Sequence, residues 1–208
     1  AIKSTNQQIS KSTHIIITLG TAWLYRFVET NTSVANCHKV PQKQFVKELI
    51  SVAEVMESLE NIINLIKKVN PTATLVFTVS PIRHLKDGFV ENTQSKSHLV
   101  SAIHSILEDT IYYFPSYEIM MDELRDYRFY AEDMIHPNGL AINYIWEKFK
   151  FIWISEATFK IMDEVDVIQK GLLHKPFNPD SAAHQKFLNK IEERKQQLQI
   201  KFPHVVFN

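Results

Sequence analysis

The chain has 208 residues, of which 45% are hydrophobic and 22% charged, with 23 basic and 23 acidic side chains. This length suits one domain, or one domain with an extension, and the composition is that of a globular protein. The balanced charge excludes the strongly basic surface typical of proteins that bind nucleic acid or anionic membranes, and no apolar run is long enough to span a bilayer. We therefore expect neither nucleic acid nor a membrane among its partners.

The cysteine content and the amino terminus bear on the cellular compartment. The single cysteine, Cys37, excludes an intrachain disulfide and fits a reducing compartment. Residues 1–13 are polar and lack the apolar segment of a secretory signal peptide. Both features predict a cytoplasmic location for the chain as given. There is no initiator Met, so we expect a processed product or a fragment, and any signal peptide would lie upstream of residue 1.

Short apolar runs alternate with long amphipathic ones through most of the chain. The short runs are typical of strands buried on both faces, whereas the long ones repeat apolar residues every three or four positions, as helices do. In chain order they predict strand 14–19, helix 44–70, strand 75–79, helix 92–114, strand 117–121 and a helix from Gly139 to about Gln169. This order predicts parallel strands with right-handed crossovers, and hence a doubly wound α/β sheet with helices on both faces.

The last part of the chain is expected to be helical. Gly171 predicts the end of a helix, a linker covers residues 175–180, and a polar helix from about Ser181 to Ile200 carries one narrow apolar stripe. We divide the chain into an α/β domain at residues 1–170 and a helical carboxyl-terminal extension at residues 171–208.

Ligands of parallel sheets bind outside the carboxyl ends of the strands. The loops that follow the three expected strands therefore share one rim, and they carry Gly20-Thr21, Ser80 to His84, and Asp133 with His136. An Asp three residues before a His can accept a hydrogen bond from the imidazole Nδ1–H, as in the general-base half of a hydrolytic triad. The same spacing also fits a structural Asp–His bond, or a capping Asp, at the start of a helix.

The other rim residues each have a structural alternative. Gly20 and Thr21 can offer backbone N–H groups to an oxyanion, or can simply form a turn. Ser80 precedes a proline and is more typical of a turn than of a strand-to-helix nucleophile elbow. Arg83, followed by His84, can bind a substrate carboxylate or phosphate in bidentate fashion, or can pair with a local acid such as Asp87 or one in residues 122–126.

The cysteine and the histidines offer weaker candidates. Cys37 and His38 are adjacent, so they rarely point together as a dyad, and a buried inert thiol is the default against a dyad of Cys37 with His136. The nine histidines show no close pair at metal-ligand spacing. The sequence therefore predicts no metal site and no cofactor.

Five motifs in order along the chain together resemble a known family. They are Thr18-Leu19-Gly20-Thr21-Ala22-Trp23, Asn36-Cys37-His38-Lys39, Val79-Ser80-Pro81-Ile82-Arg83-His84, Asp126-Tyr127-Arg128-Phe129-Tyr130 and Asp133-Met134-Ile135-His136-Pro137. The resemblance is to the GSCFA family of the SGNH/GDSL hydrolase superfamily and covers roughly residues 14–180. It implies a three-layer α/β/α sandwich with a parallel, flavodoxin-like sheet, and ester hydrolysis or acyl transfer by a serine. It also implies Asp133 and His136 as the base pair and an oxyanion block at Gly20 and its neighbours.

Two departures from the family pattern shape the expectation. The Gly-Ser-Cys-Phe-Ala motif, whose serine is the expected nucleophile, does not occur in this sequence, and three strands make a thin sheet for such long helices. Both lead us to expect an amino-terminally truncated domain, with a strand and the nucleophile upstream of residue 1. The oxyanion block of the superfamily usually has an Asn where this chain has Ala22, and loss of one such donor costs about 10²–10³ in rate.

We therefore expect a serine esterase of the SGNH type that acts on a small-molecule or carbohydrate ester, with this chain inactive by itself. The alternatives are a non-catalytic binding or assembly module on the same fold, and an acyltransferase to a sugar hydroxyl. If His136 Nε2 faces an open pocket, the enzyme is favoured, and if that nitrogen is buried against protein, the module is favoured. The oligomeric state does not follow from the sequence.

Overall fold

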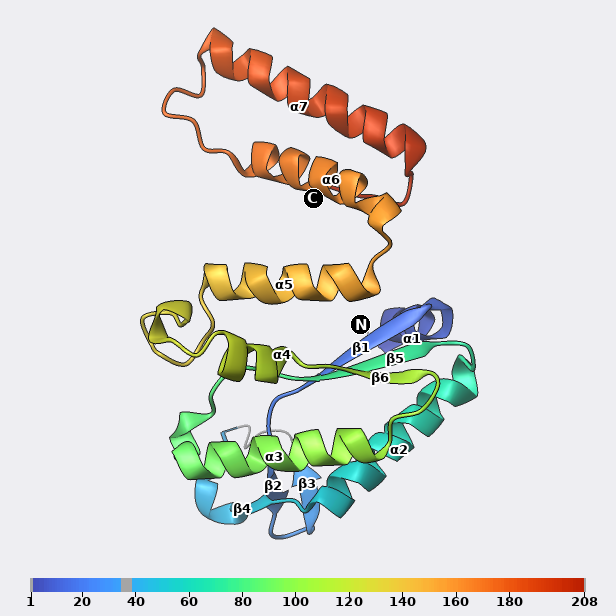
Figure 1. Cartoon of the computed structure of the whole chain (residues 1–208), viewed down its shortest axis with the longest axis vertical. Helices are drawn as coiled ribbons and strands as arrows, with labels where there is room; N and C mark the ends of the chain where they lie inside the picture. Colours follow the sequence, from blue (N-terminus) through green and yellow to red (C-terminus); the bar gives the residue numbers. More distant parts are fainter. Residues whose placement is uncertain (1, 35–38, 208) are drawn as a thin grey trace. The chain divides into compact units, whose positions relative to one another are not determined.

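Three parallel strands in the order β1-β5-β6 form the main sheet (Figure 1). They are β1 (His14–Leu19), β5 (Thr74–Val79) and β6 (Ile111–Phe114). The structure, a computed structural model, describes residues 2–34 and 39–207 and divides into two compact units, Ala1–Glu147 and Lys148–Asn208. β1 and β5 pair along their whole length, with Leu19 opposite Val79, so their carboxyl ends lie side by side. The strands expected at 14–19 and 75–79 are confirmed.

The strand expected at residues 117–121 is wrong. Those residues lie in α4 (Ser116–Glu118) and a π-helical turn (Ile119–Glu123), and the third strand is β6. Residues 111–114 had been assigned to the preceding helix, which in fact ends at Ser105. A short apolar run does not by itself distinguish a strand from a buried helical turn, and here the aromatic and β-branched run 111–114 is the one that pairs with β5.

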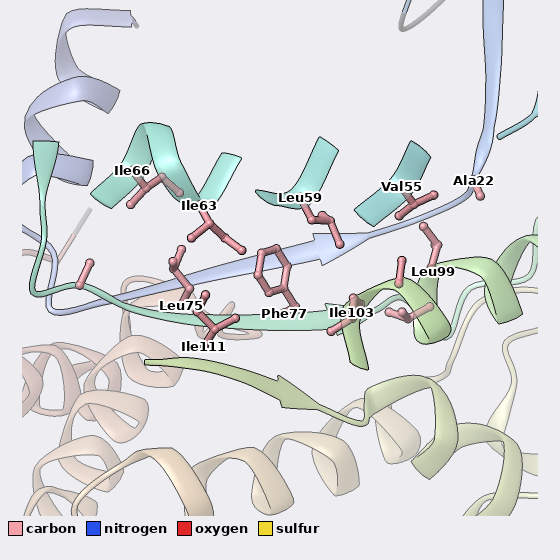
Figure 2. Packing of buried hydrophobic residues seen from close by; sticks show 13 residues of the cluster. Ala22, Val55, Leu59, Ile63, Ile66, Leu75, Phe77, Leu99, Ile103 and Ile111 are labelled. Carbon is pink, nitrogen blue, oxygen red and sulfur yellow. The ribbon is translucent and has the colours of Figure 1, made fainter. Parts of the chain in front are cut away.

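Two helices cover one face of this sheet, α2 (Val52–Val69) and α3 (Phe89–Ser105) (Figure 1). Ser51 caps α2: its Oγ accepts from the Glu54 N–H, and the Glu54 carboxylate accepts from the Ser51 N–H. Figure 2 shows the apolar side chains of α2 directed toward those of β5. The labelled residues of this core are Ala22, Val55, Leu59, Ile63, Ile66, Leu75, Phe77, Leu99, Ile103 and Ile111.

A second, antiparallel sheet lies between β1 and α2 in the sequence and was not expected. Its order is β3-β2-β4, with β2 (Trp23–Phe27), β3 (Thr32–Val34) and, after a 3₁₀ turn (Gln42–Gln44), β4 (Phe45–Leu49). Residues 44–50 had been assigned to the helix that begins only at Val52. The assignment failed because Phe45 and Leu49 are four apart, a spacing that fits one face of a strand as well as one face of a helix.

The remaining helices confirm the expected fold class. α1 (Ile2–Lys11) precedes β1, and α5 (Gly139–Trp153) follows the loop that contains Asp133 and His136. The helix expected over 139–169 is instead divided at Ile154 into α5 and, after a 3₁₀ turn (Glu156–Thr158), α6 (Phe159–Leu173). The chain is thus a mixed α/β protein with a parallel sheet flanked by helices, consistent with a three-layer α/β/α fold, and with further helices at its carboxyl end. Within the described ranges, no helix combines the length and apolar character needed to cross a membrane.

The carboxyl-terminal unit has its own small core between α6 and α7 (Ala182–Lys201). Ile168, Ile191 and Leu198 are buried in it, and Arg194 donates two hydrogen bonds to the Glu164 carboxylate at 2.7 and 2.6 Å. The helix expected at 181–200 is confirmed, whereas the helix end expected at Gly171 is wrong, because α6 continues to Leu173. The division into domains at residue 170 stays a prediction.

Gly171 serves the packing of this unit instead. A Cβ placed on it would lie 2.5 Å from Ile191 Cδ1 and 2.8 Å from Ile191 Cγ1. The side chain of Ile191 is buried and β-branched, so it has little freedom to move aside. The absence of a side chain at position 171 therefore allows α6 and α7 to approach closely.

We predict that Gly171→Ala destabilises the carboxyl-terminal unit. In an ordinary helix interior this change stabilises by about 1 kcal/mol, whereas overpacking of a core costs about 1–3 kcal/mol. Hydrogen exchange should show faster exchange of α7 amides and unchanged exchange of β5 amides. Gly139→Ala is the matched control, because no atom lies within 4 Å of the added Cβ. Slower exchange in α7 after Gly171→Ala would contradict the packing role.

Candidate active site

A buried lysine joins the carboxyl ends of β1 and β5. Lys96 in α3 is 1% exposed, and its Nζ donates to the Gly20 carbonyl at 2.6 Å and the Ser80 carbonyl at 2.7 Å. Gly20 and Ser80 are the first residues after the two strands. The two loops are therefore held side by side at the rim of the sheet. Sequence reasoning missed Lys96, although its spacing from Leu99 and Ile103 places it on the inner face of α3.

The charge of Lys96 has no acidic partner. Within the part of the chain that the structure describes, no carboxylate lies at ion-pair distance from its Nζ, and the nearby ring is that of Tyr117, with its centroid at 5.8 Å. Burial lowers the pKa of Lys96 to about 8. At neutral pH the side chain of Lys96 is still an ammonium. Its N–H groups donate to the carbonyls of Gly20 and Ser80, which lie just beyond the paired strands β1 and β5.

The segment expected to form the oxyanion block is bonded to α3. Thr21 Oγ1 and Ser95 Oγ share a hydrogen bond of 2.9 Å, and Ser95 Oγ accepts from the Ala22 N–H at 2.7 Å. Thr21 Oγ1 also accepts from the Trp23 N–H at 3.1 Å. The Ala22 side chain is 2% exposed and belongs to the core beside Val55 and Leu99 (Figure 2). Position 22 thus contributes to packing, and neither its side chain nor its N–H is available to an oxyanion.

Gly20 lies against His84. A Cβ on Gly20 would be 3.5 Å from His84 Nε2, so the imidazole stands in van der Waals range of the glycine. The His84 N–H donates to the buried Asn92 Oδ1 at 2.8 Å, which holds the loop against α3. Burial, and then the positive charge of Lys96, lower the pKa of His84. His84 is therefore held in its neutral form beside Gly20.

Ser80 has the bonds of a turn-forming residue. Its Oγ accepts from the Ile82 N–H at 3.3 Å, and its N–H donates to the Leu19 carbonyl at 2.9 Å. Its carbonyl accepts from Lys96. Within the described ranges the hydroxyl shares no hydrogen bond with a histidine, so the geometry found there provides no base for a nucleophilic Ser80.

Asp133 and His136 are in direct contact. Asp133 Oδ2 lies 2.6 Å from His136 Nδ1, and Oδ1 accepts from the backbone N–H groups of Ile135 at 2.9 Å and His136 at 3.0 Å. These backbone bonds, together with the imidazole bond, lower the pKa of Asp133 to about 2. The carboxylate is ionised at neutral pH and can only accept, so Nδ1 carries the hydrogen and the lone pair of a neutral ring is on Nε2.

The second nitrogen of His136 is accessible. The His136 side chain is 55% exposed, and Nε2 has no hydrogen-bond partner among residues 2–34 and 39–207. An oriented ring with a free basic nitrogen is the arrangement that general-base catalysis requires. A pocket at Nε2, which would favour an enzyme over a binding module, does not follow from side-chain exposure alone, so this choice stays a prediction.

The loop that carries the pair is held by polar contacts. The Ala131 N–H donates to the His136 carbonyl at 2.7 Å, and Met134, between the pair, has a left-handed backbone with φ of 57°. Asn138 Nδ2 donates to the Arg128 carbonyl at 2.6 Å, and its Oδ1 accepts from the N–H groups of Leu140 and Ala141 at 3.1 Å. Asn138 is thus the residue that caps α5, in place of Asp133. Its position before Gly139 at the start of the helix was the available signal.

Arg83 connects the loop after β5 with the loop of the pair. Its backbone N–H donates to the Ile135 carbonyl and its Nη1 to the Met134 carbonyl, each at 3.4 Å. Its guanidinium lies over the rings of Tyr130 and Tyr127, at 4.1 and 5.3 Å from their centroids. The suggested pairing with Asp87 or an acid of residues 122–126 is not found in the described part of the chain, because Asp87 binds Lys47 and Asp126 binds Arg128.

The structure therefore gathers most of the candidate residues at one rim. Asp133 and His136 bond to each other, Arg83 bonds to their loop, and Lys96 joins Gly20 to Ser80, while Thr21 is bonded to α3. Asn36, Cys37 and His38 lie outside the described residues. Among those that are described, no three His, Asp or Glu side chains gather as metal ligands. The catalytic roles stay predictions.

Two family models match the sequence. The model of the GSCFA family matches residues 1–149, and the model of the GSCFA domain protein, C-terminal domain, matches residues 165–208. No curated protein and no solved structure matches it. The first family match ends close to the boundary between the two compact units, and the second lies inside the carboxyl-terminal unit.

We predict that Lys96 makes the free energy of unfolding rise with pH above about 8. Between that pH and the ordinary lysine pKa of about 10.4, the unfolded chain binds a proton that the folded chain has released, so stability increases with pH. Urea unfolding from pH 7.5 to 9.5 should show the rise. The raised pKa of Tyr113 opposes it only near and above pH 10.

Lys96→Met should abolish this rise, whereas Lys86→Met, at an exposed position of the 3₁₀ turn that precedes α3, should retain it. Lys96→Met should also lower stability at pH 7.5, because two carbonyls lose their donor, at about 1–3 kcal/mol for each buried group left unsatisfied. An unchanged pH slope in Lys96→Met would show that the ammonium is not desolvated in the folded protein.

Proposed function

The chain belongs to the GSCFA family, and on that basis we propose that it supplies the acid–base pair of a serine hydrolase of the SGNH/GDSL type, acting on an ester. The observation that carries this proposal is the 2.6 Å contact between His136 Nδ1 and Asp133 Oδ2, on a histidine side chain that is 55% exposed. Carboxylate, imidazole and an open side for a nucleophile are the elements of a hydrolytic triad.

In the proposed reaction, His136 Nε2 takes the proton of a serine hydroxyl while the serine oxygen attacks the ester carbonyl carbon. The tetrahedral intermediate then collapses, its bond to the alcohol oxygen breaks, and His136 gives its proton to that oxygen. Water repeats both steps and releases the acid. Asp133 remains ionised throughout, keeps Nδ1 protonated and stabilises the imidazolium, which its low pKa allows.

We further propose that the nucleophile is the serine of a Gly-Ser-Cys-Phe-Ala motif, which this sequence does not contain. No serine, threonine or cysteine of the described ranges bonds to His136 Nε2. Acyl transfer to a sugar hydroxyl would use the same first half-reaction, with the sugar in place of water.

The oxyanion would depend on backbone donors at Gly20 or Thr21. The side chain at position 22 is a buried alanine, and the Ala22 N–H is bonded to Ser95. A missing side-chain donor costs about 10²–10³ in rate, so a slow enzyme is expected. The same observation favours the second candidate function, a non-catalytic binding module on the family fold.

We predict that a protein extended to include the motif hydrolyses p-nitrophenyl acetate, and that His136→Ala lowers kcat by about 10²–10⁴. Asp133→Asn should lower kcat by up to about 10⁴, because an amide no longer fixes the tautomer. Initial rates at pH 8 provide the measurement. The 208-residue chain by itself should be inactive.

Asp109→Asn is the matched control, because Asp109 is another exposed turn aspartate and lies before the amino end of β6, away from the rim of the site. It should leave kcat unchanged. An extended protein that keeps full activity in His136→Ala would refute the proposed base. A folded extended protein without any activity would instead establish the binding module.

A further inference from the structure

We propose that Arg83 and Arg125 form an anion-binding subsite beside the Asp133–His136 pair, which holds a carboxylate or phosphate group of the substrate. The identification of the ligand as substrate rests on the proposed function. The anion site itself rests on the geometry around Arg83. The predicted substrate class is an ester that carries an anionic group a few atoms from the ester bond.

The subsite is a small cavity between the loop after β5 and the segment that follows α4. Its volume is about 130 Å³, and its lining includes Arg83, Arg125, Asp126, Tyr127 and Tyr130. A water molecule takes up about 30 Å³ in the liquid, so the space suits a single small oxyanion and its hydration, and not a whole ester. A cavity of this volume fits a subsite that binds one group of the substrate, while the ester bond lies outside it at the Asp133–His136 pair.

The positive charges at this cavity are not compensated locally. Within the described ranges neither Arg83 nor Arg125 has an ion pair. Asp126, the one acid in the lining named above, binds Arg128 at 3.2 Å, and Asp133 binds His136. Burial raises the pKa of Tyr130, so its hydroxyl stays neutral and adds no negative charge. A bound anion would therefore meet two guanidinium groups.

Arg83 is oriented before any ligand binds. Its guanidinium carbon lies over the Tyr130 ring, 4.1 Å from the centroid, and Tyr130 is only 7% exposed. This cation–π contact restricts the guanidinium, and the Met134 carbonyl takes one donor at Nη1. The donors on the other edge remain in the planar fork that matches a carboxylate or phosphate.

The position of Arg83 relates the anion to the chemistry. Its two bonds go to the carbonyls of Met134 and Ile135, which are the residues between Asp133 and His136. The Arg83 guanidinium is therefore hydrogen-bonded to the same loop that carries the imidazole of His136. A substrate anchored through its anion on Arg83 would present a nearby ester bond on the same surface.

Isothermal titration of the 208-residue chain tests the subsite without requiring hydrolysis. Monomethyl succinate and phenyl phosphate are the anionic probes, and dimethyl succinate is the neutral one. We expect the anions to bind and the neutral diester not to bind. The tighter of the two anionic probes identifies carboxylate or phosphate as the natural group.

Arg83→Gln should weaken the binding of the better anion by about tenfold or more, since a bidentate charged contact is lost. Because Arg83 also contacts the site loop, Arg125→Gln provides a second variant at an exposed position, where a loss of about threefold is expected. Lys86→Gln is the matched control: it removes one positive charge at an exposed position of the 3₁₀ turn Leu85–Asp87, outside the lining of the cavity, and binding should be unchanged.

Equal weakening in Arg83→Gln, Arg125→Gln and Lys86→Gln would overturn the subsite, because it would indicate only a general electrostatic effect. Absence of binding, or equal binding of dimethyl succinate, would also overturn it. Anion binding that depends on Arg83, in a protein whose extended form hydrolyses no ester, would refute the proposed function and leave the anion site standing. Hydrolysis that depends on His136, with the same rate for charged and neutral esters in wild type and Arg83→Gln, would refute the subsite alone.

Discussion

The parallel ladder of β1, β5 and β6 is the constraint on which the site depends. Parallel strands end at one edge, so three loops from distant parts of the sequence leave the sheet close together. The end of such a ladder also leaves carbonyl groups without a strand partner, and buried carbonyls need a donor. Lys96 supplies it at Gly20 and Ser80, and by doing so fixes the distance between two of the three loops. Holding the loops in this way requires burial of the Lys96 ammonium, and this desolvation lowers the pKa of Lys96.

The loop of Asp133 and His136 does not leave the sheet directly, because α4 and two short helical turns separate it from β6, and it is held in a different way. Few of its side chains are buried, and Asp133 and His136 are both about half exposed. Its shape comes from local hydrogen bonds. The Asp133 carboxylate accepts two backbone N–H groups of the loop, and the Asn138 side chain joins the loop to the first turn of α5. Arg83 then bonds this locally formed loop to the sheet. The acid–base pair is therefore formed by its own short segment and is only positioned by the rest of the fold.

This difference explains what could be predicted from the sequence. The Asp133–His136 contact spans three residues, so spacing and residue type were enough to predict it. The Lys96 contacts span 76 and 16 residues and depend on how α3 packs on the sheet, which no local pattern encodes. The second sheet was missed because a spacing of four fits strands and helices alike. Gly171 was misread because a close approach of two helices leaves the same sequence signal as a helix end.

The electrostatics of the rim distinguish its two histidines. His84 lies beside Gly20, partly buried and near the Lys96 ammonium, and both effects lower its pKa and disfavour a charged ring. His136 is exposed and bonded to a carboxylate that stays ionised down to a pH of about 2. A general base must accept a proton and hold it until the leaving group needs it, which requires stabilisation of the imidazolium. Only His136 has a partner that can provide this. The lowered pKa of His84 instead disfavours a second cation beside Gly20, next to the Lys96 ammonium.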